Sequence, residues 1–431
     1  MKKTDRKISE GVRISRGRSQ VWTTAWVIVM AIFFPAGAGN SQEVDHSLDK
    51  SLQGIKFGIL AYIDYSEGDL PLAAGEQQHY NQFALTRGYL TVEKNFHPWL
   101  GARITLDLSQ DKPDTITVGV NPTAKVPDDL EGSYMIRVKY LYAVLYPQDL
   151  GFLTNMKVEV GMGHTPWLDF EEHFNPYRCQ GTMAIERAGV FNSADIGVSI
   201  MGNFGGELED VQKKTGNKSY TGRFGSWHLG VYNGGGYSAV ENNQNKLFEG
   251  RVTLRPLPYI IPELQLSYLY ISGDGNTKYT FQHNDYWPYY RTQIGMLSFQ
   301  RPVVIFTAQY FATDGNAKGN WVYDAKGRAL RTVGQSYFLN LKPGPESKWS
   351  AFGRFDYFNI DPEHQILQHG QAAYSMIIYG LTYQISSANL VMVDFEETNY
   401  QRDADAKGKL PKQNNALGVE DKLQVVWQIS F

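Results

Sequence analysis

Apolar and polar side chains alternate with a period of two in many segments of the chain. In residues 422–431 the apolar positions are Leu423, Val425, Trp427, Ile429 and Phe431. Because a β-strand sends successive side chains to opposite faces, this segment has one apolar face and one mostly polar face. Ten such residues can cross a bilayer when the strand is tilted. Strands of a soluble β-sandwich alternate in the same way, so this pattern alone leaves two architectures open.

Charged residues occupy one face of several other segments. Lys56 and Asp64 share a face in residues 53–65, and Arg103 alternates with Ile104 and Leu106 further on. In residues 136–146 we expect an apolar face opposite Arg137 and Lys139, made of Ile136, Val138, Tyr140, Tyr142, Val144 and Tyr146. An Arg or Lys facing lipid costs about 2–4 kcal/mol at mid-bilayer. The charges are therefore expected to face an interior that contains water.

This pattern predicts sixteen strands, an even number as single-chain bacterial barrels require. They are expected at residues 53–65, 82–95, 98–110, 133–147, 155–164, 194–204, 223–233, 246–257, 262–272, 288–300, 302–313, 329–342, 347–359, 371–385, 387–400 and 418–431. Short turns alternate with long links, which in such barrels are extracellular. Residues 205–222 break the alternation. They are either a periplasmic excursion or the mark of a misplaced strand.

The first 38 residues have the pattern of a cleaved secretory signal peptide. A basic head precedes the apolar stretch 21–34, and the small residues Ala36-Gly37-Ala38 follow. Fourteen apolar residues are fewer than the ~20 that a membrane-spanning helix needs. We predict cleavage after Ala38, a short lead-in over 39–52 and one barrel over 53–431.

Composition and charge narrow the function further. The chain has 41 basic and 44 acidic residues; without the seven basic and two acidic residues of the leader the balance is 34 to 42, a net charge of −8. That balance argues against nucleic acid as a partner. The single Cys179 cannot form an internal disulfide.

The leader and the aromatic residue that ends the last strand favour a barrel over a sandwich. Phe431 resembles the signal that outer-membrane assembly machinery reads in barrel proteins. We therefore predict an all-β fold, a transmembrane antiparallel β-barrel in the bacterial outer membrane. Its expected partners are this assembly machinery, the lipid bilayer and lipopolysaccharide.

The predicted inner faces supply candidate pore-lining cations. They are Lys56, Arg103, Arg137, Lys139, Lys157, Arg251, Arg255 and Arg354, against the acidic Asp64, Asp107, Glu159, Glu249, Asp356, Asp394 and Glu396. Rings of Arg and Lys attract anions, whereas acidic rings attract cations. With eight basic and seven acidic residues, two interpretations stay open. One is an anion-selective pore, and the other is a general pore whose charges are mainly salt-linked scaffolding.

The link over residues 165–193 is the candidate constriction loop because it is rich in aromatic and charged side chains. Its charged candidates are Asp169, Glu171, Glu172, Arg178, Glu186 and Arg187. His164 and His173 lie near carboxylates, but their spacing matches no closed four-ligand metal set. No G-x-S-x-G motif of a serine hydrolase occurs. We predict a passive pore with no cofactor and no enzymatic activity; a plugged structural or adhesive barrel and an outer-membrane hydrolase are the alternatives.

A more specific likeness lies in residues 155–204 and 247–256. The stretch 158–167, VEVGMGHTPW, and the later segments around Pro176, Glu186 and Asp195 resemble the phosphate-selective porins, the porin O and P family. The resemblance implies a sixteen-stranded homotrimer with its third extracellular loop folded into the pore. It also implies that Arg and Lys side chains in the lumen select small anions. Preference of this chain for phosphate does not follow from the resemblance alone.

Overall fold

The computed structural model describes residues 54–71, 77–110, 133–366, 372–401 and 418–431. The predicted leader, its cleavage site after Ala38 and the lead-in over 39–52 lie outside these residues. So does the predicted link over 111–132, and so does the predicted link over 401–417 except for Gln401.

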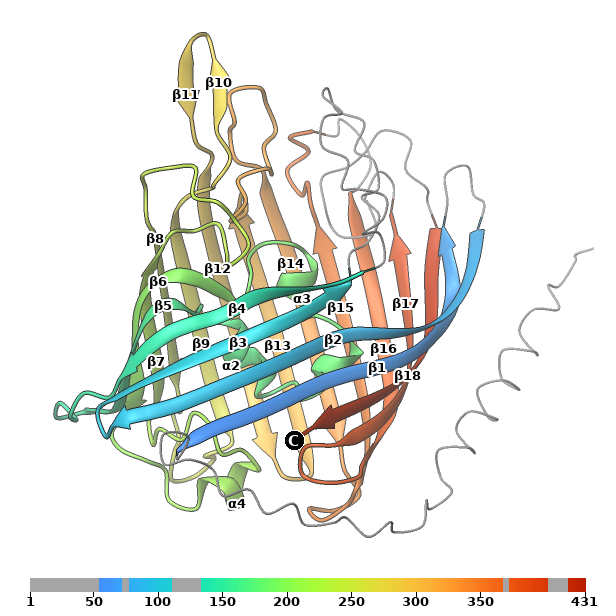
Figure 1. The fold of residues 1–431 in the computed structure, drawn as a ribbon. Helices are drawn as coiled ribbons and strands as arrows, with labels where there is room; N and C mark the ends of the chain where they lie inside the picture. Colours follow the sequence, from blue (N-terminus) through green and yellow to red (C-terminus); the bar gives the residue numbers. More distant parts are fainter. Residues whose placement is uncertain (1–53, 72–76, 111–132, 367–371, 402–417) are drawn as a thin grey trace, which may run out of the picture. The chain divides into compact units, whose positions relative to one another are not determined.

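Sixteen of the described strands form one closed antiparallel barrel (Figure 1), which confirms the predicted fold and strand number. The strands are β1 (Ile55–Pro71), β2 (Gln77–His97), β3 (Leu100–Gln110), β4 (Tyr134–Leu145), β5 (Leu153–His164), β6 (Ala194–Phe204), β7 (Gly225–Tyr232), β8 (Leu247–Leu254), β9 (Leu264–Asp274), β12 (Tyr289–Arg301), β13 (Val304–Asp314), β14 (Arg331–Leu341), β15 (Trp349–Asn359), β16 (Ala373–Gln384), β17 (Leu390–Tyr400) and β18 (Gly418–Ser430). Two further strands, β10 (Tyr279–Phe281) and β11 (Asn284–Tyr286), pair with each other in a separate hairpin that the alternation did not predict. No described helix is long and apolar enough to cross a membrane.

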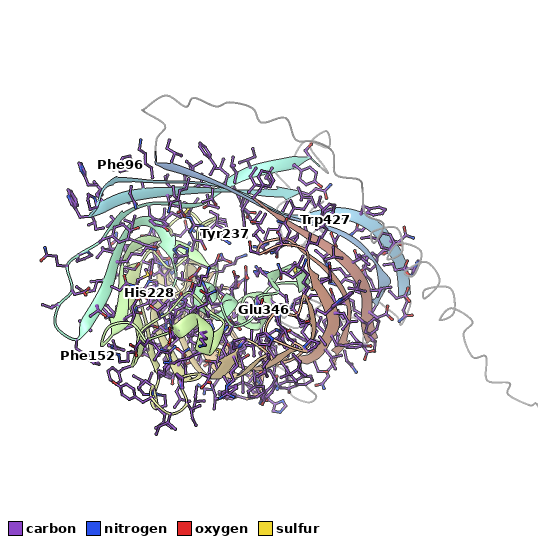
Figure 2. All side chains as sticks on the ribbon, turned by 90° about the horizontal axis from the view of Figure 1, so that it is seen from below. Phe96, Phe152, His228, Tyr237, Glu346 and Trp427 are labelled. Atoms are coloured by element: carbon purple, nitrogen blue, oxygen red, sulfur yellow. The ribbon has the colours of Figure 1, made fainter. Side chains whose placement is uncertain are left out.

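The barrel wall alternates between a buried inner face and an apolar outer face. In β14, Ser336 and Phe338 are buried, whereas Tyr337 and Leu339 are each 41% exposed on the outside. The outward side chains of the other strands are likewise often large and apolar. Seen from below (Figure 2), Phe96 and Phe152 lie at the outer edge of the ring and Tyr237 lies inside it. Because a closed barrel leaves no backbone edge unpaired, this outer surface is suited to lipid.

Pairing of the first and last strands closes the barrel. Tyr62 lies opposite Gln428, and the ladder continues to Asp69 opposite Asp421. At the other end, the Ile59 amide donates to the Phe431 carbonyl (2.8 Å) and the Phe431 amide donates back (3.1 Å). These bonds satisfy the backbone groups that an open sheet would leave exposed.

The predicted apolar face of residues 136–146 is wrong beyond Val138. Tyr140 and Tyr142 are 6% and 5% exposed and point inward, whereas Leu141 is 54% exposed on the outside. The cause is a β-bulge. The register with β3 shifts between Thr105–Tyr140 and Leu106–Val138, which leaves Lys139 as the extra residue. One extra residue exchanges the two faces of the strand after it.

The connections also differ from the prediction at one rim. β1 and β2 continue well past the expected strand ends, so the predicted link over 66–81 shrinks to residues 72–76. The long links that the structure describes leave the rim at the top of Figure 1, here called the long-loop rim, and the turns join strands at the opposite, short-turn rim. Residues 205–224 form a true excursion at the short-turn rim, with helix α4 (Val211–Thr215), and no strand is misplaced there.

Candidate pore constriction

The connection from β5 to β6, residues 165–193, folds into the barrel interior. It contains α2 (Leu168–Glu172), the 3-10 helix η4 (Arg178–Gln180) and α3 (Ala184–Arg187). Its apolar side chains Trp167, Phe170 and Ile185 are fully buried in one cluster with inward residues of the barrel wall. An extended aqueous loop would not bury its apolar residues in this way.

The tip of this loop is bonded to the wall formed by β12–β17, here called the covered wall. The Tyr177 hydroxyl donates to Asn340 Oδ1 (3.1 Å) on β14. Arg354 on β15 donates to the Thr182 carbonyl oxygen (2.9 Å) and pairs with Asp356 (2.5 Å), both side chains being 1–2% exposed. Of the predicted pore-lining cations, Arg354 therefore faces inward but meets the loop rather than water.

Further along the loop, Arg187 pairs with Glu396 on β17 (2.6 Å), which also pairs with Lys422 on β18 (3.1 Å). Cys179 is buried beside Met392, with 3.8 Å between the two sulfur atoms. Burial raises the pKa of the Cys179 thiol to about 12. On this side of the interior the loop is therefore in direct contact with the wall.

Two other predicted pore-lining cations, Arg251 and Arg255, donate hydrogen bonds to segments that connect strands. Arg251 on β8 is 1% exposed, donates to the Pro166 carbonyl oxygen (2.9 Å) and lies 4.0 Å from the ring centre of Phe170. Arg255 is 2% exposed and donates to the Gly222 carbonyl oxygen of the short-turn excursion. Arg251 thus fixes the start of the constriction loop, and Arg255 fixes the stem of the excursion.

The inner face of β2–β5, here called the open wall, is different. Its predicted cations Arg103, Arg137 and Lys157 have side chains 26%, 46% and 30% exposed. Each forms an ion pair on the wall itself, with Glu93 (3.4 Å), Asp107 (2.6 Å) and Glu159 (2.5 Å) respectively. Side chains that point inward in a closed barrel and stay exposed must face space that water can enter.

Tyrosine rings support these cations. Arg103 lies 5.0 Å from the ring centre of Tyr140, Arg137 lies 5.1 Å from Tyr237, and Lys157 lies 5.6 Å from Tyr142. Such contacts stabilise a cation over the electron-rich face of an aromatic ring. The inward turn of Tyr140 and Tyr142, which the bulge in β4 causes, therefore supplies part of this support.

Arg87 on β2 also belongs to the open wall, and the sequence prediction missed it. Arg87 donates to the Tyr89 hydroxyl, and Lys139 donates to the same oxygen (2.8 Å). Within the described part of the chain, neither Arg87 nor Lys139 forms an ion pair with a carboxylate. The alternation of β2 could have revealed Arg87, because Arg87 shares a face with Thr91 and Glu93 and the apolar Leu90 and Val92 lie on the other face. Lys56, at the far end of β1, shares the inner face and is exposed.

The constriction loop also has a partly exposed acidic edge, formed by Asp169 and Glu172. The side chains of Asp169 and Glu172 are 42% and 31% exposed. Arg178 binds Glu172 (2.8 Å) and Glu186 (2.7 Å) and so holds this edge together. The loop therefore presents partly exposed carboxylates, and the open wall presents partly exposed cations.

Buried acids fix the start of the loop. Glu159 accepts bonds from the His164 backbone amide (2.9 Å) and ring (2.9 Å). Gly163 leaves room for this carboxylate, since a β-carbon there would lie 2.8 Å from Glu159 Oε2. Glu171, which accepts from Trp167 Nε1 (2.9 Å), is buried, and burial raises its pKa to about 8.

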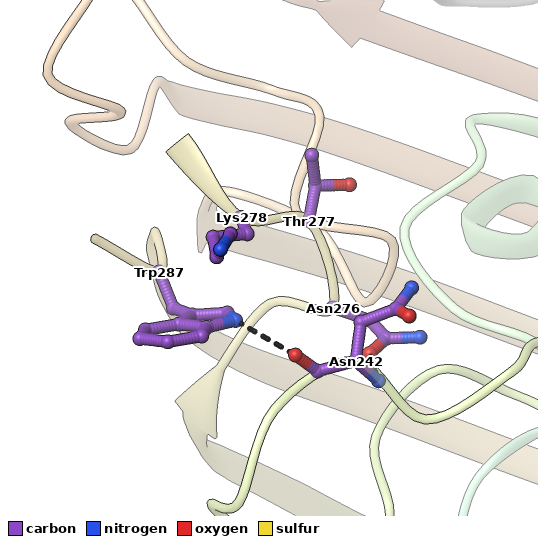
Figure 3. A pocket seen from close by; sticks show the side chains of 5 residues that line it. All are labelled: Asn242, Asn276, Thr277, Lys278 and Trp287. Atoms are coloured by element: carbon purple, nitrogen blue, oxygen red, sulfur yellow. Dashed lines mark hydrogen bonds between the residues drawn. The ribbon is translucent and has the colours of Figure 1, made fainter. Parts of the chain in front are cut away.

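A separate hollow lies among the links of the long-loop rim (Figure 3). It has a volume of about 460 Å³ and is lined by Asn242, Asn276, Thr277, Lys278 and Trp287. Trp287 Nε1 donates to the Asn242 carbonyl oxygen (3.2 Å). Lys278 is paired with Asp285 (3.1 Å). The side chains that line the hollow are therefore neutral, except for Lys278, whose charge is neutralised by Asp285.

No protein-family model matches the chain, and no curated protein matches it. Solved structures do. The chain is similar to the anion-selective porin from Comamonas acidovorans, with 11% identity, 88% of this chain and 100% of that chain covered and a TM-score of 0.53. It is similar to OmpF of Salmonella typhi in complex with daunomycin, with 10% identity, 88% and 97% covered and a TM-score of 0.54. It is also similar to the outer-membrane channel DcaP of Acinetobacter baumannii, with 10% identity, 89% and 99% covered and a TM-score of 0.53.

The chain has the fold of a bacterial outer-membrane porin. At such low identities the likeness concerns the fold, and the fold agrees with the apolar outer surface of the barrel. Together they place the barrel in the bacterial outer membrane, as the sequence predicted.

Proposed function

We propose that this chain is a porin through which small hydrophilic solutes and ions diffuse passively, with a weak preference for anions. One observation carries the proposal. Three inward-facing cations of the open wall, Arg103, Arg137 and Lys157, remain partly exposed, whereas Arg354 and Asp356 of the covered wall are buried by the loop. The passage therefore runs between β2–β5 and the acidic edge of the constriction loop, and solutes cross it without a chemical step.

The anion preference rests on the cations that carry no neutralising partner. Arg103, Arg137 and Lys157 are each paired, so their net contribution to the field is reduced. Arg87 and Lys139 form no ion pair within the described part of the chain and stand at the same tyrosine hydroxyl. Because Coulomb energies grow several-fold where water is thin, charges at the narrowest point dominate over those at the mouths.

Purified protein in planar bilayers tests both parts. We expect stable ohmic conductance and, in a salt gradient, a reversal potential on the anion side. The double variant Arg87→Gln with Lys139→Gln should abolish that preference, whereas Arg328→Gln should preserve it because Arg328 is an exposed loop residue paired with Asp324. Absence of conductance from folded protein would favour the plugged structural or adhesive alternative. A cation preference in the unmodified protein would show that Asp169 and Glu172 dominate.

Two finer proposals come from the sequence resemblance. A preference for phosphate predicts that millimolar phosphate reduces chloride conductance, and sulfate at the same ionic strength serves as the control. A homotrimer predicts conductance in steps of three and a native mass three times that of the chain. Failure of either result would leave the diffusion pore in place and remove the specific likeness to porin O and P.

A further inference from the structure

The excursion at the short-turn rim is larger than the barrel requires. Antiparallel neighbours such as β6 and β7 can be joined by two residues. Here residues 205–224 form a stem in which the Leu208 amide donates to the Thr221 carbonyl (2.8 Å) and the Arg223 amide donates to the Gly206 carbonyl (2.8 Å). α4 follows this stem, and Gly216 after it lies against Pro302 in the neighbouring turn.

The return segment of the excursion extends into the barrel and touches the constriction loop. The Tyr220 hydroxyl donates to Asp169 Oδ2 (2.7 Å). The Tyr220 ring makes edge contacts with Phe170 (4.9 Å) and His173 (5.0 Å). Asn217 Nδ2 donates to the His173 carbonyl oxygen (3.4 Å). The loop is therefore held from the short-turn side as well as from the covered wall.

The Asp169 carboxylate is held mainly by its hydrogen bond from the Tyr220 hydroxyl. Within the described residues this carboxylate accepts a side-chain hydrogen bond from Tyr220, and the nearest ionic partner, His173 Nδ1, is 3.9 Å away. The Asp169 side chain is 42% exposed, so it borders space that water can enter. Tyr220 also has a φ of +52°, a left-handed conformation that side chains with a β-carbon rarely adopt. The hydroxyl reaches Asp169 from that conformation.

We propose that Tyr220 is a positioning residue for the constriction, and that the excursion acts as a brace which keeps the Asp169 carboxylate on the loop side of the passage. This inference rests on the proposed pore function. Without the brace, the partly exposed Asp169 side chain leaves this position and narrows the passage between the loop and the open wall. The excursion thereby sets both the width of the passage and the separation of its charges.

Single-channel recordings of Tyr220→Phe test the brace, since this variant keeps the ring and loses the hydroxyl. Loss of a hydrogen bond to a charged group favours the displaced position by roughly tenfold. We expect about a tenfold rise in the fraction of time spent in reduced-conductance states. Tyr259→Phe, at an exposed tyrosine of the 257–261 turn, should behave like the unmodified protein.

A double-variant cycle separates positioning from general loosening. If Tyr220 acts through Asp169, Tyr220→Phe should add nothing when Asp169→Ala, which leaves no acceptor for the Tyr220 hydroxyl, is already present. Replacing residues 208–221 by Asn-Gly should reproduce the effect of Tyr220→Phe, with folding checked by heat-dependent gel mobility. Unchanged single-channel noise in Tyr220→Phe, or an undiminished effect in the Asp169→Ala background, overturns the brace. Absence of conductance in the unmodified protein would instead refute the pore.

Discussion

Both sides of the barrel interior carry ion pairs, but these pairs are buried on one side and partly exposed on the other. On the covered wall, Arg354 and Asp356 form an ion pair with side chains 1% and 2% exposed, under the constriction loop. On the open wall, Arg103 and Glu93 form a pair with side chains 26% and 41% exposed. An inward charge therefore lines a passage only where the loop leaves it uncovered. Elsewhere the same residue type fixes the loop in place.

The largest expected effect is on the covered wall. Arg354→Met leaves Asp356 as a buried charge without its partner, and removing one member of a buried pair costs about 3–5 kcal/mol. Urea unfolding followed by gel mobility should show this loss. Replacing both residues, Arg354→Met with Asp356→Leu, should recover much of the stability because no lone charge remains. A single variant as stable as the unmodified protein would contradict the distinction between the two walls.

A pH-dependent effect of intermediate size is expected at Glu171. Its pKa is raised from 4.5 to about 8 in the folded protein, mainly by burial. Below pH 4.5 both states hold the proton; between about 4.5 and 8 the unfolded chain releases it first, so stability falls as the pH rises.

The variant Glu171→Gln keeps an acceptor for Trp167 and removes this penalty. Each pKa unit corresponds to about 1.4 kcal/mol, so the variant should gain a few kcal/mol over the unmodified protein near pH 8. The two proteins should have similar stability near pH 4.5. Thermal unfolding midpoints measured from pH 4.5 to 8.5 decide this, and a constant difference across that range would rule out titration of Glu171.

The smallest effect on stability is expected at Arg103, the counterpart of Arg354 on the open wall. Arg103→Gln removes a partly exposed ion pair, and such pairs contribute under about 1 kcal/mol. The same substitution removes a positive charge from the passage, so the reversal potential should shift toward cations. A large loss of stability without a change in selectivity would mean that the open wall is packed like the covered one.

The sequence predicted the barrel well because the fold repeats one simple rule. Lipid outside and water or protein inside impose a period of two on every strand, and sixteen strands follow from counting it. The rule fails where one residue is inserted. Nothing local marks Lys139 as a bulge, so the faces of Tyr140 and Tyr142 were exchanged in the prediction.

The alternation could not predict whether each inward-facing cation is buried or exposed, and the reason is different. Arg251 meets Pro166, 85 residues earlier, and Arg354 meets Thr182, 172 residues earlier. Periodicity gives the direction of a side chain and says nothing of a distant segment that covers it. Tyr220 shows the same limit, since its partner Asp169 lies 51 residues away in a loop that enters the barrel from the other rim.

Enclosure of the loop has a consequence for the order of folding. The apolar cluster joins Trp167 and Ile185 of the loop to Ile378, Met392 and Val426 of strands that follow much later in the chain. A closed barrel could admit such a loop only by rearranging, so the later strands are expected to assemble around it. We expect β14–β18 to pack against the loop as they fold. This packing would lower the entropic cost of bringing β18 next to β1. Closure would be the last event, and its speed would depend on a segment that takes no part in the β-sheet.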